Sequence, residues 1–281
     1  MELPQRRVTT AKGGSSSSLG AIFADIWAHR YALRNLIIKD FRIRYRNMSL
    51  GVIWSVLNPL VMLSILLIIF TVVYPQRGQA YFPVSVLIGL VSFNFVSLCI
   101  PAAANSIIEH APLVKKVNFP RQILPVSVVL SQSIQVLVQI GLVAIFVLAF
   151  RVPLTAKALL APLIVFILLT FVIGAGLLVS ALNVVFRDTR YIVESLLTVL
   201  FWLSPVFYPL KIVHEKFPKW LFGLYILNPL AGCVEGLRRV ILQDTYPDGV
   251  SISVAVAVSI ASFVAGFTVF TRFQRKFADL V

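Results

Sequence analysis

Residues that could carry out acid–base catalysis or bind a metal ion are few in this sequence and lie far apart. The three histidines, His29, His110 and His214, fall in three separate segments, and no H-E-x-x-H pair is present. One predicted loop holds the imidazole and carboxylate groups that such chemistry would need, namely His214, Glu215, Asp244 and Asp248. Charged residues in a loop are usually solvated surface residues. We therefore expect no catalytic residue and no metal site.

Motifs for a nucleophile or a nucleotide are also missing. The sequence has no G-x-S-x-G turn and no G-x-x-x-x-G-K-[ST] phosphate loop. Ion-coupled transport needs carboxylates deep in a membrane span. Glu194 lies near the end of a predicted span, and Glu235 is followed by Arg238 and Arg239 at the spacing of helical ion pairs. We expect this chain to bind no cofactor, so the energy for any transport must come from elsewhere.

The composition places these residues in a membrane. Hydrophobic residues make up 59% of the chain and charged residues 13%, whereas about 25% are charged in soluble domains. The mean hydropathy is +0.92. The net charge of +14 resembles that of a nucleic-acid-binding protein, but the basic residues lie in short loops where anionic lipid headgroups attract them. We predict an all-α, multi-pass membrane protein with no nucleic-acid partner.

Six apolar stretches are each long enough to cross about 30 Å of hydrocarbon as a helix. They cover approximately residues 51–74, 83–104, 124–150, 158–185, 191–208 and 250–270. Pro59 predicts a kink in the first span, and Gly174 and Gly176 permit close helix contact in the fourth. Between the last two spans, residues 220–227 and 230–242 are apolar but too short to cross. We predict that they form re-entrant half-helices, with a structured extracellular loop as the alternative.

The N-terminal part has two predicted segments. Residues 1–18 are polar and low in complexity, and we expect a flexible cytoplasmic tail. Residues 19–46 place apolar side chains near one helical face among basic ones, which predicts an amphipathic helix in the membrane interface. Residues 41–46 alternate as a strand would, but a lone strand beside a bilayer lacks hydrogen-bond partners. A continued or broken helix is favoured there, and residues 19–281 form one transmembrane domain.

Positive charge predicts which way the spans point. Arg42, Arg44 and Arg46 come directly before the first span. With six spans, the side that holds both termini carries 17 of the 25 Lys and Arg residues, and the other side carries 8. Cytoplasmic loops carry the excess of positive charge, so we expect both termini in the cytoplasm.

Four motifs in this order resemble the membrane subunits of ABC-2 type exporters, and within these the O-antigen, teichoic acid and capsule export permeases. They are RIRYRNMSLGVIWSVLNP (42–59), LVKKVNFPRQILP (113–125), FRDTRYIVESLLTVLFWLSPVFYP (186–209) and LNPLAGCVEGLRRVIL (227–242). The resemblance extends over nearly the whole chain after the tail. It implies a homodimer in a bacterial inner membrane, paired with two copies of a separate ATP-binding subunit that holds ATP and magnesium.

The resemblance also implies where the partner and the path lie. The amphipathic helix would pack on the ATPase, and the region between the second and third spans would include or flank the helix that couples to it, with Glu109, Leu113, Lys115, Lys116 and Arg121 as candidates. The first and fifth spans of each copy would line a channel on the dimer axis. The half-helices would shape its outer mouth.

Aromatic residues concentrate in those two spans: Trp54, Phe70 and Tyr74 in the first, and Phe201, Trp202, Phe207 and Tyr208 in the fifth. Sugars present C–H faces that pack on flat rings, whereas a belt of interfacial aromatic residues is the alternative reading. We therefore predict a permease that exports a lipid-linked polysaccharide outward. The alternatives are an ABC-2 permease for a small drug or lipid and, disfavoured by the lack of an acidic pair, a membrane glycosyl- or lipid-transferase.

Overall fold

The computed structural model describes residues 27–46, 49–73, 81–116 and 119–280, and within these ranges the regular structure is entirely helical. In chain order the elements are α2 (Arg30–Tyr45), α3 (Ile53–Ile68), η1 (Ile69–Val73), α4 (Phe82–Glu109), α5 (Ala111–Lys116), α6 (Ile123–Ala149), η2 (Ala156–Leu160), α7 (Ala161–Val185), α8 (Thr189–Leu203), α9 (Leu210–Lys216), α10 (Lys219–Ile226), α11 (Pro229–Leu242), α12 (Gly249–Phe273), η3 (Gln274–Lys276) and α13 (Phe277–Leu280). The predicted tail, 1–18, and the start of the amphipathic helix, 19–26, lie outside the described residues.

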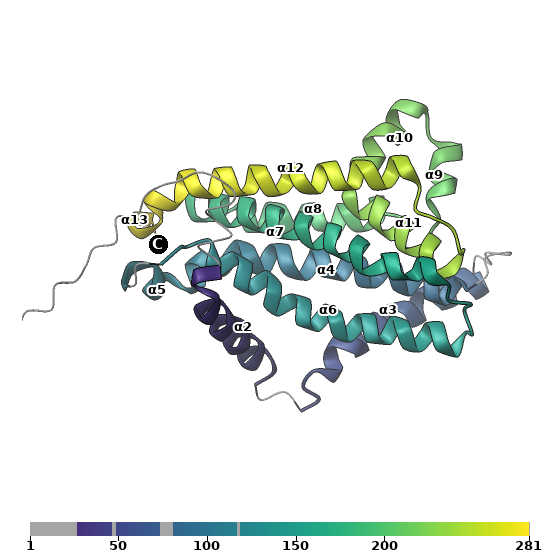
Figure 1. Cartoon of the computed structure of the whole chain (residues 1–281), viewed down its shortest axis with the longest axis horizontal. Coiled ribbons are helices and arrows are strands. Elements are labelled where there is room, and N and C mark those ends of the chain that lie inside the picture. The colour runs from purple at the N-terminus through teal and green to yellow at the C-terminus, as the bar shows by residue number, and fades with distance from the viewer. Residues whose placement is uncertain (1–26, 47–48, 74–80, 117–118, 281) are drawn as a thin grey trace, which may run out of the picture.

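A bundle of four long helices, α4, α6, α7 and α12, forms the body of the protein (Figure 1). Each is long and apolar enough to cross a membrane, which confirms the prediction of a multi-pass helical protein. Helix α4 is the most enclosed of the four, because α6, α7, α8 and α11 all pack against it. We name the two ends of the bundle by the short helices found there, the α5 end and the α9 end (Figure 1).

Glycine allows α7 and α12 to pack with their backbones in contact. A Cβ atom built on Gly266 would lie 2.0 Å from the carbonyl oxygen of Gly174, and one on Gly174 would lie 2.4 Å from the backbone nitrogen of Phe263. Neither position has room for a side chain. A Cβ on Gly176 would lie 3.0 Å from that of Ala103 on α4. Close helix contact at both sequence-predicted glycines is therefore confirmed.

The six-span count is not confirmed. Among the described residues, four helices satisfy the length and apolarity of a span, and a fifth does if α10 and α11 are counted as one. Helix α3 contains Pro59, has 16 residues and continues as the π-helical turn η1. Helix α8 has 15 residues and ends at Leu203, because Pro205 disfavours helical geometry in Ser204.

The segment between α8 and α12 contains short helices at the predicted positions. Helices α10 and α11 meet at an angle of 85°. The bend lies at Asn228, whose side-chain oxygen accepts a hydrogen bond from the backbone N–H of Leu230 (3.1 Å), and Pro229 begins α11. Sequence reasoning missed the seven-residue helix α9.

Helix α2 continues through Tyr45, which confirms a helix rather than a strand at 41–46. It has no buried residue and packs against α6. The contact is polar, because Arg44 donates to the side-chain oxygens of Gln132 and Gln135. A guanidinium that carries several N–H groups suits two amide acceptors on successive turns of one helix.

Candidate functional site

Aromatic side chains from α4, α8, η1 and the α8–α9 connection meet towards the α9 end. We call this group the aromatic cluster: Phe70, Phe82, Phe93, Phe201, Trp202, Phe207 and Tyr208. Phe207 lies at its centre, with its ring 5.6 Å from that of Phe70, 5.7 Å from that of Trp202 and 5.2 Å from that of Tyr208. These distances are within the range of favourable ring pairs. The cluster joins η1 to the end of α8.

The structure brings together five of the seven aromatic residues predicted to line a path. Trp54 lies near the start of α3, one helix length from Phe70, and takes part in none of the ring contacts. Tyr74 lies outside the described residues. Phe82 and Phe93 were not predicted, because nothing in the sequence indicates which helix faces α8.

A buried guanidinium holds the α8–α9 connection, which carries Phe207 and Tyr208, in place. Arg238 of α11 donates hydrogen bonds to the carbonyl oxygens of Ser85, Val206 and Tyr208. On the other side of this connection, a Cβ atom on Gly89 would lie 2.2 Å from the carbonyl oxygen of Val206. Arg238 therefore fixes the position of Phe207 relative to α4. Of the two predicted partners of Glu235, Arg239 forms the ion pair (3.1 Å) and Arg238 does not.

Two further polar contacts fix the α8–α9 connection to the bent helix pair. The hydroxyl of Tyr208 donates to the carbonyl oxygen of Trp202 (3.1 Å) and lies 3.2 Å from the hydroxyl of Tyr225 on α10. The side-chain amide of Asn228 donates to the hydroxyl of Ser204 (2.9 Å). The position of the rings thus depends on the bend between α10 and α11.

A cleft of about 340 Å³ runs between α4 and α8 from the aromatic cluster toward the α5 end. It is lined by Phe93, Ser97, Pro101, Glu194, Leu197, Thr198 and Phe201. Ring faces therefore lie at one end of the cleft and a carboxylate at the other. Such a surface can contact both the C–H faces and the hydroxyl groups of a ligand without forming a closed pocket.

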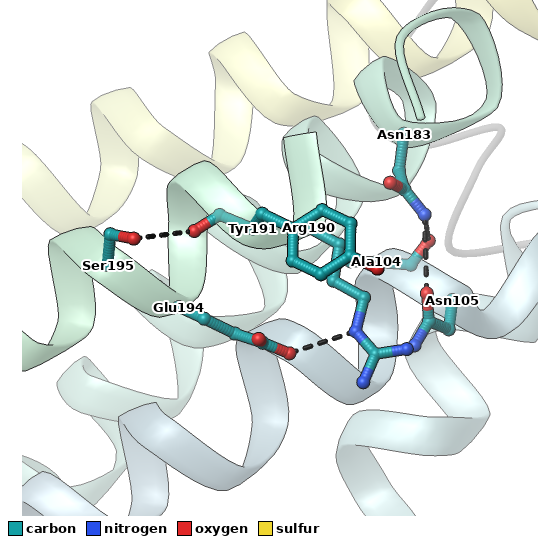
Figure 2. A network of polar contacts seen from close by, with 7 residues as sticks. All are labelled: Ala104, Asn105, Asn183, Arg190, Tyr191, Glu194 and Ser195. Atoms are coloured by element: carbon teal, nitrogen blue, oxygen red, sulfur yellow. Dashed lines mark hydrogen bonds and ion pairs between the residues drawn. The ribbon is translucent and has the colours of Figure 1, made fainter. Parts of the chain in front are cut away.

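Glu194, which lines this cleft, lies among polar side chains from α4, α7 and α8 (Figure 2). Arg190 and Glu194 form an ion pair along α8 (2.9 Å), and both side chains are substantially exposed. Asn183 of α7 donates to the carbonyl oxygen of Ala104 (3.0 Å) and lies 3.3 Å from the side-chain oxygen of Asn105. The contacts of Asn183, one buried and one partly buried, join α7 to α4, whereas the Arg190–Glu194 ion pair is open to a ligand.

Helix α5 presents most of the residues predicted to couple to an ATPase. Val114 is buried and anchors the helix, whereas Leu113, Lys115 and Lys116 are exposed. Glu109 is exposed at the end of α4. Arg121 is different, since its guanidinium donates to the carbonyl oxygen of Gln274 near the C-terminus of the described chain.

A buried histidine that sequence reasoning missed joins α2 to α5. Nδ1 of His110 lies 2.9 Å from the carbonyl oxygen of Ser106, so this nitrogen carries the hydrogen. Its Nε2 lies 3.2 Å from Nζ of Lys39 and 3.9 Å from the carboxylate of Asp40. The backbone carbonyl of His110 also accepts the first hydrogen bonds of α5. One residue therefore positions the start of α5 against α2.

The three interfacial arginines do not act as one group. Arg42 and Arg46 are exposed, whereas Arg44 is half-buried against α6. No three His, Cys, Asp or Glu residues among those described are grouped so that they could hold a metal ion. Cys99 and Cys233 are buried free thiols.

Comparison with known proteins identifies the family of this chain. The chain is 29% identical to the O-antigen export system permease protein RfbA of Myxococcus xanthus, over 92% of this chain and 98% of the relative. It is 28% identical to an RfbA of Klebsiella pneumoniae, over 86% and 92% of the two chains, and 24% identical to the polysialic acid transport protein KpsM of Escherichia coli, over 84% and 90%. A family model for the ABC-2 type transporter matches residues 31–242, and the chain therefore belongs to this family of membrane transport proteins.

Proposed function

We propose that this chain is the permease subunit of an ABC transporter that exports lipid-linked polysaccharide outward across the bacterial inner membrane. ATP and magnesium would bind to a separate ATPase subunit. The observation that carries the substrate assignment is the aromatic cluster at one end of the α4–α8 cleft. The names of the curated relatives, two O-antigen export permeases and a polysialic acid transport protein, agree with it.

The aromatic cluster suits a polymer that must move past it. Trp202 has 61% of its surface exposed, and Phe201 lies half-buried between it and Phe93. Flat rings give an extended contact to the C–H face of a sugar without enclosing it. A charged, fully enclosing pocket would hold one residue of the polymer too tightly to let the next one pass.

We further propose that α3 with η1 and α8 serve as the first and fifth of six spans, and that α10 and α11 enter the membrane from the α9 end. Six spans place both termini on the cytoplasmic side, in agreement with the charge distribution. The surfaces of α3 and α8 that face away from the bundle are rich in exposed apolar residues. In a homodimer, the two copies of these helices would surround a shared path.

Two copies of the ATPase would dock at the α5 end. Exposed Lys115 and Lys116 on α5 present positive charge there. Because His110 joins α2 to α5, a displacement of one helix on the ATPase surface would move the other. This arrangement couples nucleotide-driven motion to the transmembrane helices.

Replacement of Trp202 by leucine tests the substrate assignment. Leucine keeps apolar volume but removes the flat ring, so export of surface polysaccharide should fall while expression and ATPase assembly stay normal. Trp202→Phe should restore much of the export. Phe166→Leu is the matched control, since Phe166 on α7 is 62% exposed and lies outside the cluster and the cleft.

Normal export by the Trp202→Leu variant would reject the aromatic path. Unchanged surface polysaccharide in a strain that lacks this permease altogether, together with loss of drug or lipid efflux, would favour a small-molecule permease of the same family.

A further inference from the structure

A second cavity lies on a different side of α4 from the aromatic cleft. It has a volume of about 320 Å³ and is bounded by α4, α6, α7 and α11. Its lining consists of Ile88, Val91, Ser92, Phe95, Val136, Leu137, Ile140, Val143, Ala161, Pro162, Val165, Leu168, Leu237 and Ile241. We call it the α6–α7 groove. It shares no residue with the aromatic cluster or the α4–α8 cleft.

The lining of the groove accepts only an apolar ligand. Ser92 is the one polar side chain in it, and its hydroxyl donates to the carbonyl oxygen of Ile88 on its own helix (2.8 Å). Water in the groove would find only the Ser92 oxygen as a side-chain hydrogen-bond partner, which is fewer than an ordered water needs. An apolar cavity of about 150 Å³ stays dry and can bind benzene, and this groove has about twice that volume. It can therefore hold the greater part of one hydrocarbon chain.

The groove opens toward the apolar surface of the bundle. Leu137 on α6 lines it and is 63% exposed, whereas Val91 and Phe95 on α4 form its floor and are only 5% and 3% exposed. The helices on either side are among those long and apolar enough to cross a membrane. The surface outside the mouth is therefore lipid, which can supply a chain laterally.

The depth of the groove matches one leaflet of a bilayer. Its lining residues on α6, Val136 to Val143, lie ~9–20 Å from the end of that helix at Ala149, at about 1.5 Å per residue. Half of a hydrocarbon core measures about 15 Å. A chain that entered from the leaflet on the α9 side would reach the floor with its middle and terminal carbons.

The cation Arg151 lies where the headgroup of such a lipid would lie. Arg151 follows α6 directly, is exposed, and makes no side-chain hydrogen bond or ion pair with any residue that the structure describes. Lys157 nearby in sequence is instead paired with Asp244 (3.1 Å). A guanidinium forms strong paired hydrogen bonds with phosphate.

We propose that the α6–α7 groove binds one acyl chain of a phospholipid from the leaflet on the α9 side, with the lipid phosphate at Arg151. The inference requires only that the helices lie in a membrane and does not depend on the exported substrate. The bound acyl chain fills the gap between α6 and α7 and supports α4, which also forms one wall of the α4–α8 cleft.

Photo-crosslinking tests this site. The purified chain is placed in nanodiscs that contain phosphatidylglycerol with a diazirine in the middle of one acyl chain, and labelled residues are mapped by mass spectrometry. We expect label on Val91 or Phe95, which a lipid reaches only from inside the groove. Ala161→Trp fills the groove and should abolish this label. Leu163→Trp is the control, since Leu163 lies two residues along α7, is 57% exposed and does not line the groove.

Replacement of Arg151 by glutamine should lower the label on the floor about fivefold, the factor expected for one basic residue near an anionic headgroup. Label in the wild-type protein that is confined to Leu137 and Leu163 would overturn the proposal, because the groove would then be closed to lipid. A polyprenyl-phosphate probe that labels the floor where phosphatidylglycerol does not would also overturn it.

Discussion

Loss of the Arg238 guanidinium should release the connection between α8 and α9. Arg238→Met keeps the length and apolar volume of the side chain, but it removes four donor contacts to three carbonyl oxygens. The carbonyl of Ser85 lies within α4 and keeps its helical hydrogen bond, whereas those of Val206 and Tyr208 lose their donor, at a cost of about 1–3 kcal/mol each. Some of this cost is recovered when the segment moves, so we expect a net cost of about 3 kcal/mol, which corresponds to roughly a 150-fold change in the opening equilibrium.

Thiol accessibility measures that opening. Val206 is completely buried between α4 and Arg238, so a cysteine placed there reacts only when the connection opens. The native Cys99 and Cys233 are also completely buried and add little background. We expect maleimide to label Val206→Cys about 100-fold faster when Arg238→Met is also present.

Lys211→Met is the control, since Lys211 is an exposed cation on α9 that pairs with Glu215 (3.7 Å). Equal labelling rates with and without Arg238→Met would refute the assignment of Arg238 as the residue that fixes this connection. A rate that rises equally with Lys211→Met would indicate a general loss of stability.

The remaining predictions concern three other contacts. Gly266→Ala should destabilise the protein by about 1–3 kcal/mol in thermal unfolding, because the α7 backbone occupies the space of the new Cβ, whereas Gly141→Ala, with nothing within 4 Å, should not. Replacing both Lys115 and Lys116 by glutamate should weaken co-purification of the ATPase, because both charges are exposed on α5. Hydrogen bonds from Thr155 and Lys157 lower the pKa of Asp244 below its ordinary value of 3.8. The contacts of the Asp244 carboxylate should therefore persist from neutral pH down to pH 3.8 and be lost only at lower pH, which hydrogen exchange can follow.

Each of these has a result that contradicts it. Equal melting temperatures for the two glycine variants would mean that α7 and α12 are not in backbone contact. An intact complex with normal ATPase stimulation after the double lysine replacement would place coupling elsewhere. Release of the Asp244 contacts between pH 7 and pH 5 would contradict a lowered pKa.

Apolar patterns predicted the long helices well, because each must bury or present apolar surface over the full width of a bilayer. They could not predict the ends of α8, where Pro205 stops the helix before the apolar run ends. The helical spacing from Glu235 suited both Arg238 and Arg239, and only the tertiary structure directs Arg238 to carbonyl groups on other segments.

The aromatic cluster, too, could be predicted from the sequence only in part. The sequence contained Phe201, Trp202 and Phe207 close together, and these were predicted as path residues. Phe82 and Phe93 come from a helix more than 100 residues earlier and join them only because α4 packs against α8. His110 could not be recognised either, since its partners Lys39 and Asp40 lie on a helix far away in the chain.

If α8 is the fifth span, as proposed above, its shortness has a mechanical consequence for the surrounding bilayer. At about 1.5 Å per residue its 15 residues extend ~22 Å, whereas the hydrocarbon is about 30 Å thick. Lipid in contact with so short a helix must thin, at a cost of a fraction of a kcal/mol for each Å of mismatch. Two copies that place their α8 helices against each other would remove that surface from lipid. Elastic relaxation of the bilayer would then add a force for pairing that no side-chain contact supplies.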